Sequence, residues 1–316
     1  MNALINKAHS PPRTRGNGVF MNMLVGIGLL VLALFLLWMF AIAPQMFQRP
    51  SLTTLAKYDY AHRGLHNAER GIPENSLLAF RIAAESGFGI ELDVQLTRDQ
   101  QVVVFHDEDL SRVCGQNLKV CDLTYDELQK FPLLGTSETI PTLRDALAAI
   151  GRRTPVIVEL KYYSEYQLLC PKVFAVLSEY KGAYCVESFN PLVVKWFKDH
   201  QPQVIRGQLM TQVEPNKQVN KFEAFWGRNL FSNFITRPHF EAYQYEYRNR
   251  PSMWLAKNML GMQEISWIIT DIDTYRQLKN DNCIIIFEGF EPYKEVRPVI
   301  VQPPLPIPYR AVSSDK

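Results

Sequence analysis

Residues 89–94 read GIELDV, and a second apolar run, Val102 to Phe105, leads directly into His106. Both runs are rich in β-forming residues, and polar side chains stand where each run ends. Side chains two residues apart on a strand share one face, so Glu91 and Asp93 point the same way. Apolar strands that end in polar residues are typical of barrel enzymes, whose active sites lie at the carboxyl ends of the strands.

The same pattern repeats from Tyr60 onward, where β-rich runs alternate with helical stretches. This alternation indicates βαβ units and a parallel sheet. Nine runs qualify as strands: Tyr60–Ala61, Gly89–Val94, Val102–Phe105, Val156–Leu160, Ala183–Val186, Val204–Gln208, Phe231–Ile235, Ser266–Ile269 and Cys283–Phe287. Helices are expected at Ser76–Ser86, Thr142–Ile150, Tyr166–Tyr180, Pro191–His200 and Asp273–Asn280.

The predicted fold class is α/β, a TIM-type (β/α)8 barrel over residues 58–292, because one barrel of this kind needs roughly 250 residues. Nine runs compete for eight places in the barrel, and we expect Phe231–Ile235 to be the extra one. No internal repeat is visible. The tail 293–316 is rich in proline, and we expect an extended strap from Arg297 to Tyr309.

The bulk composition excludes several classes of protein. The chain of 316 residues is 47% hydrophobic and 21% charged, with 34 Lys and Arg against 32 Asp and Glu. This near balance gives no sign of nucleic-acid binding or of disorder. Any functional electrostatics must therefore be local.

Leu24 to Ala43 is a run of 20 residues without a charge. About 20 apolar residues cross a bilayer core as a helix, so the run predicts one N-terminal transmembrane helix before the barrel. A cleaved signal peptide is the competing interpretation, since Ala41-Ile42-Ala43 resembles a cleavage site. The run exceeds the roughly 7–15 apolar residues of a signal peptide, and Pro44 directly after the cut also opposes cleavage.

Charges around this helix predict its orientation. Lys7, Arg13 and Arg15 precede it without any acidic residue, which favours a short cytoplasmic N-terminus over residues 1–23. Residues 44–57 then form a linker. The protein is expected to be a single-pass protein of the cell membrane with its catalytic domain outside the cytoplasm.

Cys114 and Cys121 bracket a short loop with a glycine, CGQNLKVC. In an oxidising compartment the two thiols are a suitable pair for one disulfide. Free thiols are the alternative, because geometry decides whether two cysteines can be bridged.

Polar clusters at four strand ends supply the chemistry. The first strand ends in His62 and Arg63, and the third in His106 and Asp107; Glu91 and Asp93 end the second, and Glu159 and Lys161 the fourth. Carboxylates that face one another repel and normally need a cation. Their hard oxygen ligands favour Mg²⁺ or Ca²⁺ over zinc.

The two histidines and two basic residues complete this set. An imidazole titrates near neutral pH, so His62 and His106 can act together as general acid and general base. Arg63 and Lys161 supply positive charge suited to a phosphate group.

The order and spacing of these motifs resemble the membrane-anchored bacterial type of the glycerophosphodiester phosphodiesterase family, from about Tyr60 to Glu291. The resemblance rests on His62–Gly64, Pro73–Ser76, Glu91–Val94, Thr97–Asp99, Val103–Asp107, Ile140–Leu143, Glu159–Lys161, Ser188–Pro191 and Trp267. Two departures are Gln100, in place of a turn glycine, and the last strand, IIIFEGFEP, in place of a threonine-aspartate ending. We expect neither to affect the catalytic set.

The resemblance implies a role for each site residue. His62 and His106 would be the acid/base pair, Glu91, Asp93 and Glu159 the ligands of Mg²⁺ or Ca²⁺, and Arg63 and Lys161 the phosphate-binding groups. Glu74 and Asn75 would lie at the mouth of the site, although Asn75 or Ser76 can also cap a helix. Trp267 would form a pocket wall, with plain core packing as the alternative.

The resemblance also implies the reaction, hydrolysis of a glycerophosphodiester to glycerol 3-phosphate and an alcohol. The partners are then a glycerophosphodiester or lipid head group and the membrane, with no nucleic acid. Water and the glycerol 2-hydroxyl both remain open as the nucleophile. Alternatives are a lysophospholipase D-like or phospholipase C-like activity, or a silent phosphodiester-binding module. The aromatic and basic stretch Phe222–Leu260 is a lid, a bilayer-docking face or simple outer packing.

Overall fold

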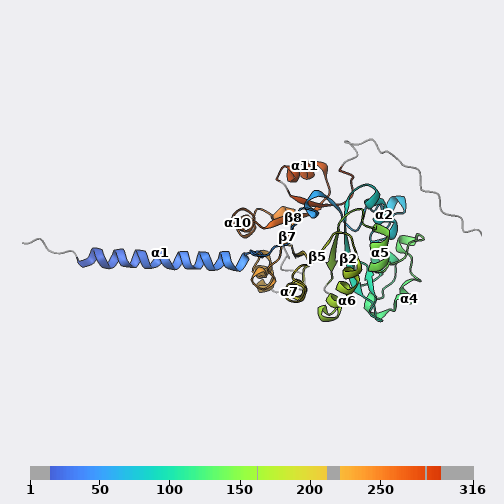
Figure 1. The fold of residues 1–316 in the computed structure, drawn as a ribbon, viewed down its shortest axis with the longest axis horizontal. Coiled ribbons are helices and arrows are strands. Elements are labelled where there is room, and N and C mark those ends of the chain that lie inside the picture. The colour runs from blue at the N-terminus through green and yellow to red at the C-terminus, as the bar shows by residue number, and fades with distance from the viewer. Residues whose placement is uncertain (1–14, 162, 212–220, 282, 293–316) are drawn as a thin grey trace, which may run out of the picture.

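Eight parallel strands close into a barrel in the computed structural model, which describes residues 15–161, 163–211, 221–281 and 283–292 (Figure 1). The strands follow the order β1-β9-β8-β7-β6-β5-β4-β2, and β1 pairs with β2 to complete the ring. They are β1 (Tyr60–Ala61), β2 (Gly89–Leu96), β4 (Val156–Leu160), β5 (Tyr184–Ser188), β6 (Arg206–Met210), β7 (Phe240–Gln244), β8 (Gln263–Ile269) and β9 (Ile284–Phe287). The predicted TIM-type barrel is confirmed.

Helices surround the strands, and the five helices expected from the sequence are present, with ends that differ by at most one residue. The helices over Lys221–Arg228 and Pro251–Leu260 were not expected. The longer ones are α2 (Leu77–Glu85), α5 (Leu143–Ile150), α6 (Tyr166–Glu179), α7 (Pro191–His200), α8 (Lys221–Arg228), α10 (Pro251–Leu260) and α11 (Ile272–Asn280). Single turns of α-helix are α3 (Ser111–Cys114), α4 (Tyr125–Leu128) and α9 (Asn233–Thr236). Short 3₁₀ turns are η1 (Leu55–Lys57), η2 (Ala68–Arg70), η3 (Val120–Asp122), η4 (Leu133–Gly135) and η5 (Tyr245–Tyr247).

The prediction of which strand lies outside the barrel was wrong. The extra strand is β3 (Val102–Val104), which pairs antiparallel with β2. Only a short turn separates these two strands, whereas a parallel pair needs a crossover of a dozen or more residues. The run Phe231–Ile235 contains α9 instead of a strand, and the missing barrel strand is β7. Short apolar runs do not distinguish helix from strand by periodicity alone.

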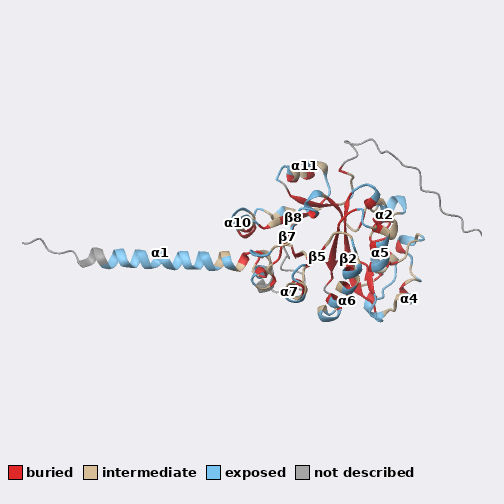
Figure 2. Ribbon diagram, in the orientation of Figure 1, coloured by how far each residue is buried: buried red, intermediate tan, exposed pale blue. Residues whose placement is uncertain are grey.

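The barrel interior is filled by side chains at the end opposite the carboxyl ends of the strands. Tyr60, Ile157, Cys185 and Phe240 are all buried there in one apolar cluster, and Leu55 of η1 packs against them. A larger cluster lies between strands and helices. Burial is concentrated in the strands, as the red colour in Figure 2 shows.

Cys114 and Cys121 are free thiols, so the suggested disulfide is not formed. The two sulfur atoms face different neighbours. Cys114 Sγ lies 4.0 Å from the carbonyl oxygen of Phe131, and Cys121 Sγ lies 3.8 Å from Asp122 Oδ1. The loop between them is held by ordinary contacts.

Helix α1 (Arg15–Ile42) extends away from the domain, and its stretch Val19–Ile42 is long and apolar enough to cross a membrane (Figure 1). It contains the predicted span except Ala43. The segment 44–57 contacts the barrel: Gln45 N donates to the Pro238 carbonyl at 3.0 Å, and Arg49 donates to the His239 carbonyl at 2.9 Å. The proline-rich tail 293–316 lies outside the described residues.

A glycine inside the barrel provides a test of this packing. A Cβ atom added to Gly207 would lie 2.0 Å from Cε2 of Phe240, a ring that is fully buried. We expect Gly207→Ala to lower the free energy of unfolding by roughly 1–3 kcal/mol, because overpacked cores shift rotamers and backbone. Thermal unfolding in detergent measures the loss.

Gly227→Ala in α8 is the matched control, since its added Cβ would meet Met210 Cε only at 3.6 Å. Alanine is the better helix former, so this variant should unfold no earlier than the parent. Equal midpoints for Gly207→Ala and the parent would contradict the described packing of the barrel interior.

Candidate active site

The four polar clusters meet at one end of the barrel, as their positions after successive strands predict. His62 follows β1, Glu91 and Asp93 stand on β2, and Glu159 stands on β4. Asp93 and Glu159 are direct partners in the pairing of β2 with β4. His106 joins them through β3, which folds back along β2 so that Phe105 N donates to the Asp93 carbonyl at 3.0 Å.

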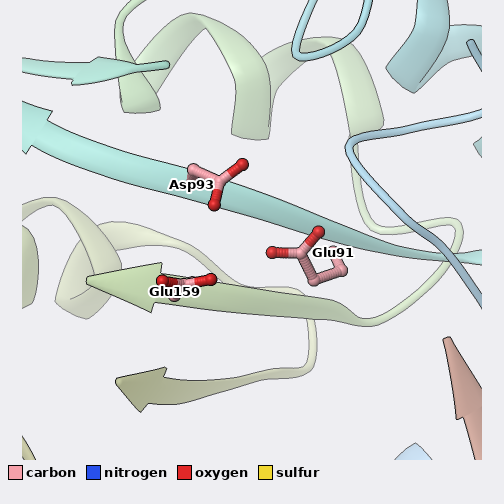
Figure 3. Close-up of side chains that lie close together, drawn as sticks. All are labelled: Glu91, Asp93 and Glu159. Atoms are coloured by element: carbon pink, nitrogen blue, oxygen red, sulfur yellow. The ribbon is translucent and has the colours of Figure 1, made fainter. Parts of the chain in front are cut away.

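Three buried carboxylates form the centre of the site. Glu91, Asp93 and Glu159 each offer an oxygen, and these oxygens lie within 4.8 Å of one another. Figure 3 shows the three side chains facing one another from two neighbouring strands. Lys161 partly balances their charge, because its Nζ lies 2.7 Å from Glu159 Oε1 and 3.2 Å from Asp93 Oδ1.

Burial and repulsion set the protonation of the cluster. Burial, together with the negative charges of Asp93 and Glu159, raises the pKa of Glu91 well above its usual value. Burial also opposes ionisation of Asp93, but the positive charges of Lys161 and Arg63 outweigh it and lower the pKa of Asp93. Without a further cation, a proton therefore binds more readily to Glu91 than to Asp93.

A fourth carboxylate, Glu187 of β5, was missed by sequence reasoning. It pairs in register with Glu159 and is buried, and its Oε2 has no hydrogen-bond partner among the described residues. Burial and the charges of Glu159 and Asp93 raise its pKa. The expected strand ends at Val186, one residue before Glu187, and the position of Glu187 next to the Ser188–Pro191 motif was the available signal.

Arg63 and Asn75 reach the site from residues with a left-handed backbone conformation. Both have positive φ, 53° and 54°, and Asn75 N donates to the Arg63 carbonyl at 2.9 Å. Ser76 caps α2 by accepting from Ala79 N, which leaves the Asn75 side chain to donate to Asp93 Oδ2 at 2.8 Å. Of the two possible caps, Ser76 is therefore the actual one.

The Arg63 side chain spans from the cluster to Glu74. Its Nη1 donates to Glu74 Oε1 at 2.8 Å, its Nε lies 3.4 Å from Asp93 Oδ2, and its backbone N–H donates to Glu91 Oε2 at 3.1 Å. Arg112 of α3 holds the same Glu74 from the other side with two bonds of 2.7 Å. Arg112 was not predicted, and nothing in the sequence marks it.

Each histidine is held by a carboxylate at Nδ1. His62 Nδ1 lies 2.8 Å from Glu288 Oε2, and His106 Nδ1 lies 2.6 Å from Asp107 Oδ1. Arg112 also donates to Asp107 at 2.7 Å. Glu288 belongs to the IIIFEGFEP ending, so the expectation that this departure leaves the catalytic set untouched was wrong.

The two imidazoles are neutral at neutral pH. Burial lowers the pKa of His62 and of His106, and it outweighs the opposing hydrogen bonds to Glu288 and Asp107. His62 Nε2 lies 3.9 Å from Glu91 Oε2, so its second nitrogen faces the carboxylate cluster.

Trp267 of β8 is half-buried beside the barrel interior. Its ring meets Phe189 edge to face at 5.7 Å, and it packs against the interior apolar cluster. Its Nε1 has no hydrogen-bond partner among the described residues. This position is compatible with a wall of the site.

The closed barrel, the carboxylates and the two histidines at the carboxyl ends of its strands define the protein as a TIM-barrel enzyme. Residues 62–269 match the model of the Glycerophosphoryl diester phosphodiesterase family, and the chain belongs to this family. It is therefore a phosphoric diester hydrolase, as the order of motifs predicted.

Relatives share most of the domain. YhdW of Bacillus subtilis is 30% identical over an alignment of 231 residues that covers 70% of this chain and 90% of that protein. Glycerophosphodiester phosphodiesterase 1 of Bos taurus is 27% identical over an alignment of 256 residues that covers 67% of this chain and 72% of that protein. An Oleispira antarctica phosphodiesterase, solved with the product sn-glycerol-3-phosphate, shares the fold with a TM-score of 0.61 at 22% identity; the match covers 73% of this chain and 92% of that one.

Glu187 allows the electrostatic account to be tested without an assay of turnover. Its pKa is higher in the folded than in the unfolded protein, so the folded state binds more protons and stability falls as pH rises above the unfolded value. We expect Glu187→Gln to raise the melting temperature of chelator-treated protein at about pH 8 and much less at about pH 5.

Glu179→Gln on exposed α6 is the control and should change little at either pH, because an exposed ion pair contributes little. A Glu187→Gln variant that melts no later than the parent at the higher pH would show that Glu187 is not under repulsion.

Proposed function

We propose that the protein is a membrane-anchored, metal-dependent enzyme that hydrolyses glycerophosphodiesters to glycerol 3-phosphate and an alcohol. One observation carries the proposal: a buried carboxylate cluster lies beside two histidines and two basic side chains at the mouth of the barrel. The glycerol 3-phosphate bound to the Oleispira relative supports the class of product.

The carboxylates fit a divalent cation. Glu91, Asp93 and Glu159 would hold it, because their oxygens converge within 4.8 Å and Lys161 and Arg63 offset only part of the negative charge. Hard oxygen ligands of this kind select Mg²⁺ or Ca²⁺. When bound, the ion supplies positive charge against the phosphate and orients an oxygen nucleophile.

Arg63 and Lys161 would bind the phosphate oxygens. Glu74, held in turn by Arg112, fixes the direction of the Arg63 guanidinium. The carboxylates of Glu159 and Asp93 raise the pKa of Lys161 in spite of its burial, so the ammonium group stays charged. Fixed positive groups stabilise the charge that develops on phosphate in the transition state.

His62 and His106 would transfer the protons. Each neutral imidazole donates its Nδ1 proton to a carboxylate, which leaves the other nitrogen free to accept a proton from the nucleophile or, once protonated, to give one to the leaving alkoxide. Glu288 and Asp107 would stabilise the imidazolium forms, as an aspartate does beside the histidine of serine proteases.

The membrane anchor is α1, and the catalytic domain would lie outside the cytoplasm. The apolar stretch Val19–Ile42 supports the span, and Lys7, Arg13 and Arg15 before it support the orientation.

Hydrolysis of glycerophosphocholine by the full-length protein tests the proposal, with glycerol 3-phosphate and choline as the expected products. His62→Ala and His106→Ala should each lower turnover by about 10²–10⁴-fold, the usual contribution of a general acid or base. The matched control is His200→Ala on exposed α7, where the imidazole stacks on Trp196, and it should keep normal turnover.

Circular dichroism verifies that each variant is folded. A folded His62→Ala or His106→Ala enzyme with parental turnover would remove that histidine from the mechanism. Phosphocholine in place of choline among the products would show cleavage on the other side of the phosphate and contradict the proposed reaction.

A further inference from the structure

The last turn of α1 is buried in the catalytic domain. Ile42 is fully buried in an apolar cluster with Leu230, Tyr243 and Met253, and Trp38 packs against the same cluster. This cluster joins the end of α1 to α10 and to the segment before α9. Figure 2 shows the change from an exposed helix to a buried end at this point.

Polar side chains of the domain hold the end of the helix. Arg237 Nη1 donates to the carbonyl oxygens of Phe40 at 2.7 Å and Ala43 at 2.9 Å, and Asn233 Nδ2 donates to that of Ile42 at 3.1 Å. The last carbonyl groups of a helix need such partners, and a cation at this end also interacts favourably with the helix dipole. The helix and the domain are therefore joined directly and not through a loose tether.

Large apolar side chains point outward from the helices around this junction. We name this set the docking face: Phe225 and Trp226 of α8, Phe234 of α9, and Trp254 and Met259 of α10, each 42–56% exposed. Phe234 meets the Phe40 ring of α1 edge to face at 5.8 Å. The docking face is thus continuous with the exposed apolar surface of α1, and Figure 1 shows α10 beside the entry of α1.

The length of α1 places the docking face at a defined depth. Asn22 is the last polar residue before the apolar run, and about 20 helical residues cross a hydrocarbon core of roughly 30 Å. A span that starts at Met23 therefore reaches its far edge near Ile42. Because the domain encloses that turn, the helices packed around it lie at the membrane interface.

We infer that the docking face rests in the lipid interface, so that the bilayer holds the catalytic domain in one orientation. Aromatic side chains prefer this zone, and an exposed apolar patch of this kind marks an interaction surface. The inference rests on the proposed membrane span. It assigns the outward aromatics of residues 222–260 to lipid contact and not to a lid.

Spin labels on the full-length protein in lipid nanodiscs test this contact. We choose phosphatidylcholine–phosphatidylglycerol discs that hold one copy, and a Cys121→Ser background that removes the exposed native thiol. Labels replace Trp254 and Met259 on the docking face, Leu168 on exposed α6 as the control, and Leu30 within α1. Collision with oxygen reports lipid, and collision with a water-soluble nickel chelate reports water.

We expect labels at Trp254→Cys and Met259→Cys to show a high oxygen-to-nickel ratio, as at Leu30→Cys, and Leu168→Cys to show a low one. Circular dichroism of each labelled protein confirms that it is folded, independently of its activity. A lipid-like Leu30 label with water-exposed labels at 254 and 259 would overturn the docking face while the span stands. A water-exposed Leu30 label would contradict both the membrane span and the docking face.

A second copy of this chain is the other occupant that such a face can bind. Discs that hold two copies distinguish a protein contact from a lipid contact. If two copies bind through this face, labels at Trp254→Cys lie close together and broaden one another's spectra. Broadening there, together with a water-like label in single-copy discs, would assign the face to a protein contact and overturn the inference.

Discussion

Four carboxylates on the neighbouring strands β2, β4 and β5 are buried together, and the rest of the site is arranged around their mutual repulsion. Burial of like charges is costly unless they are paired or one is protonated. Lys161 and Arg63 supply positive charge, Asn75 donates to Asp93, and the raised pKa values of Glu91 and Glu187 show that this compensation is incomplete. The negative charge that remains would attract a divalent cation, which in turn would bind the phosphate group.

The barrel makes this crowding possible. The apolar cluster below the site, which includes Tyr60 and Phe240, stabilises the strands. Nearer their carboxyl ends, the same strands carry polar side chains that point into the barrel. Two residues with positive φ, Arg63 and Asn75, turn the loop after β1 so that a cation and an amide reach the same carboxylate. Outer carboxylates then fix the histidines, Glu288 for His62 and Asp107 for His106. Charge is thus balanced in successive layers, from the cluster outward.

Most of the central site could be predicted from the sequence, because each residue lies within a motif at the end of an apolar run. The run before His62 and the runs that contain Glu91 and Glu159 were placed correctly, and strand periodicity predicted the shared face of Glu91 and Asp93. The errors arose where local pattern carries little information. The run before His106 has the composition of a barrel strand, although the short turn that precedes it makes it antiparallel to β2. Strand β7 was missed because two of its five residues are polar.

Glu288 and Arg112 could not be predicted, since their partners lie far away in the chain. Glu288 is 226 residues from His62, and Arg112 is 38 residues from Glu74. Only the closed barrel, which pairs β9 with β1, brings Glu288 to the first strand. The junction of α1 with the domain depends on similar distant contacts, such as Arg237 with Phe40.

Calorimetric titration of Mg²⁺ or Ca²⁺ into chelator-treated protein tests the central claim that the carboxylate cluster binds a divalent cation. Burial and repulsion favour the protonated forms of Glu91 and Glu187, so a bound ion should displace protons. We expect one bound ion, a heat that differs between two buffers of unlike ionisation heats, and much weaker binding by Asp93→Asn. No binding, or equal affinity in Asp93→Asn and the parent, would contradict the account.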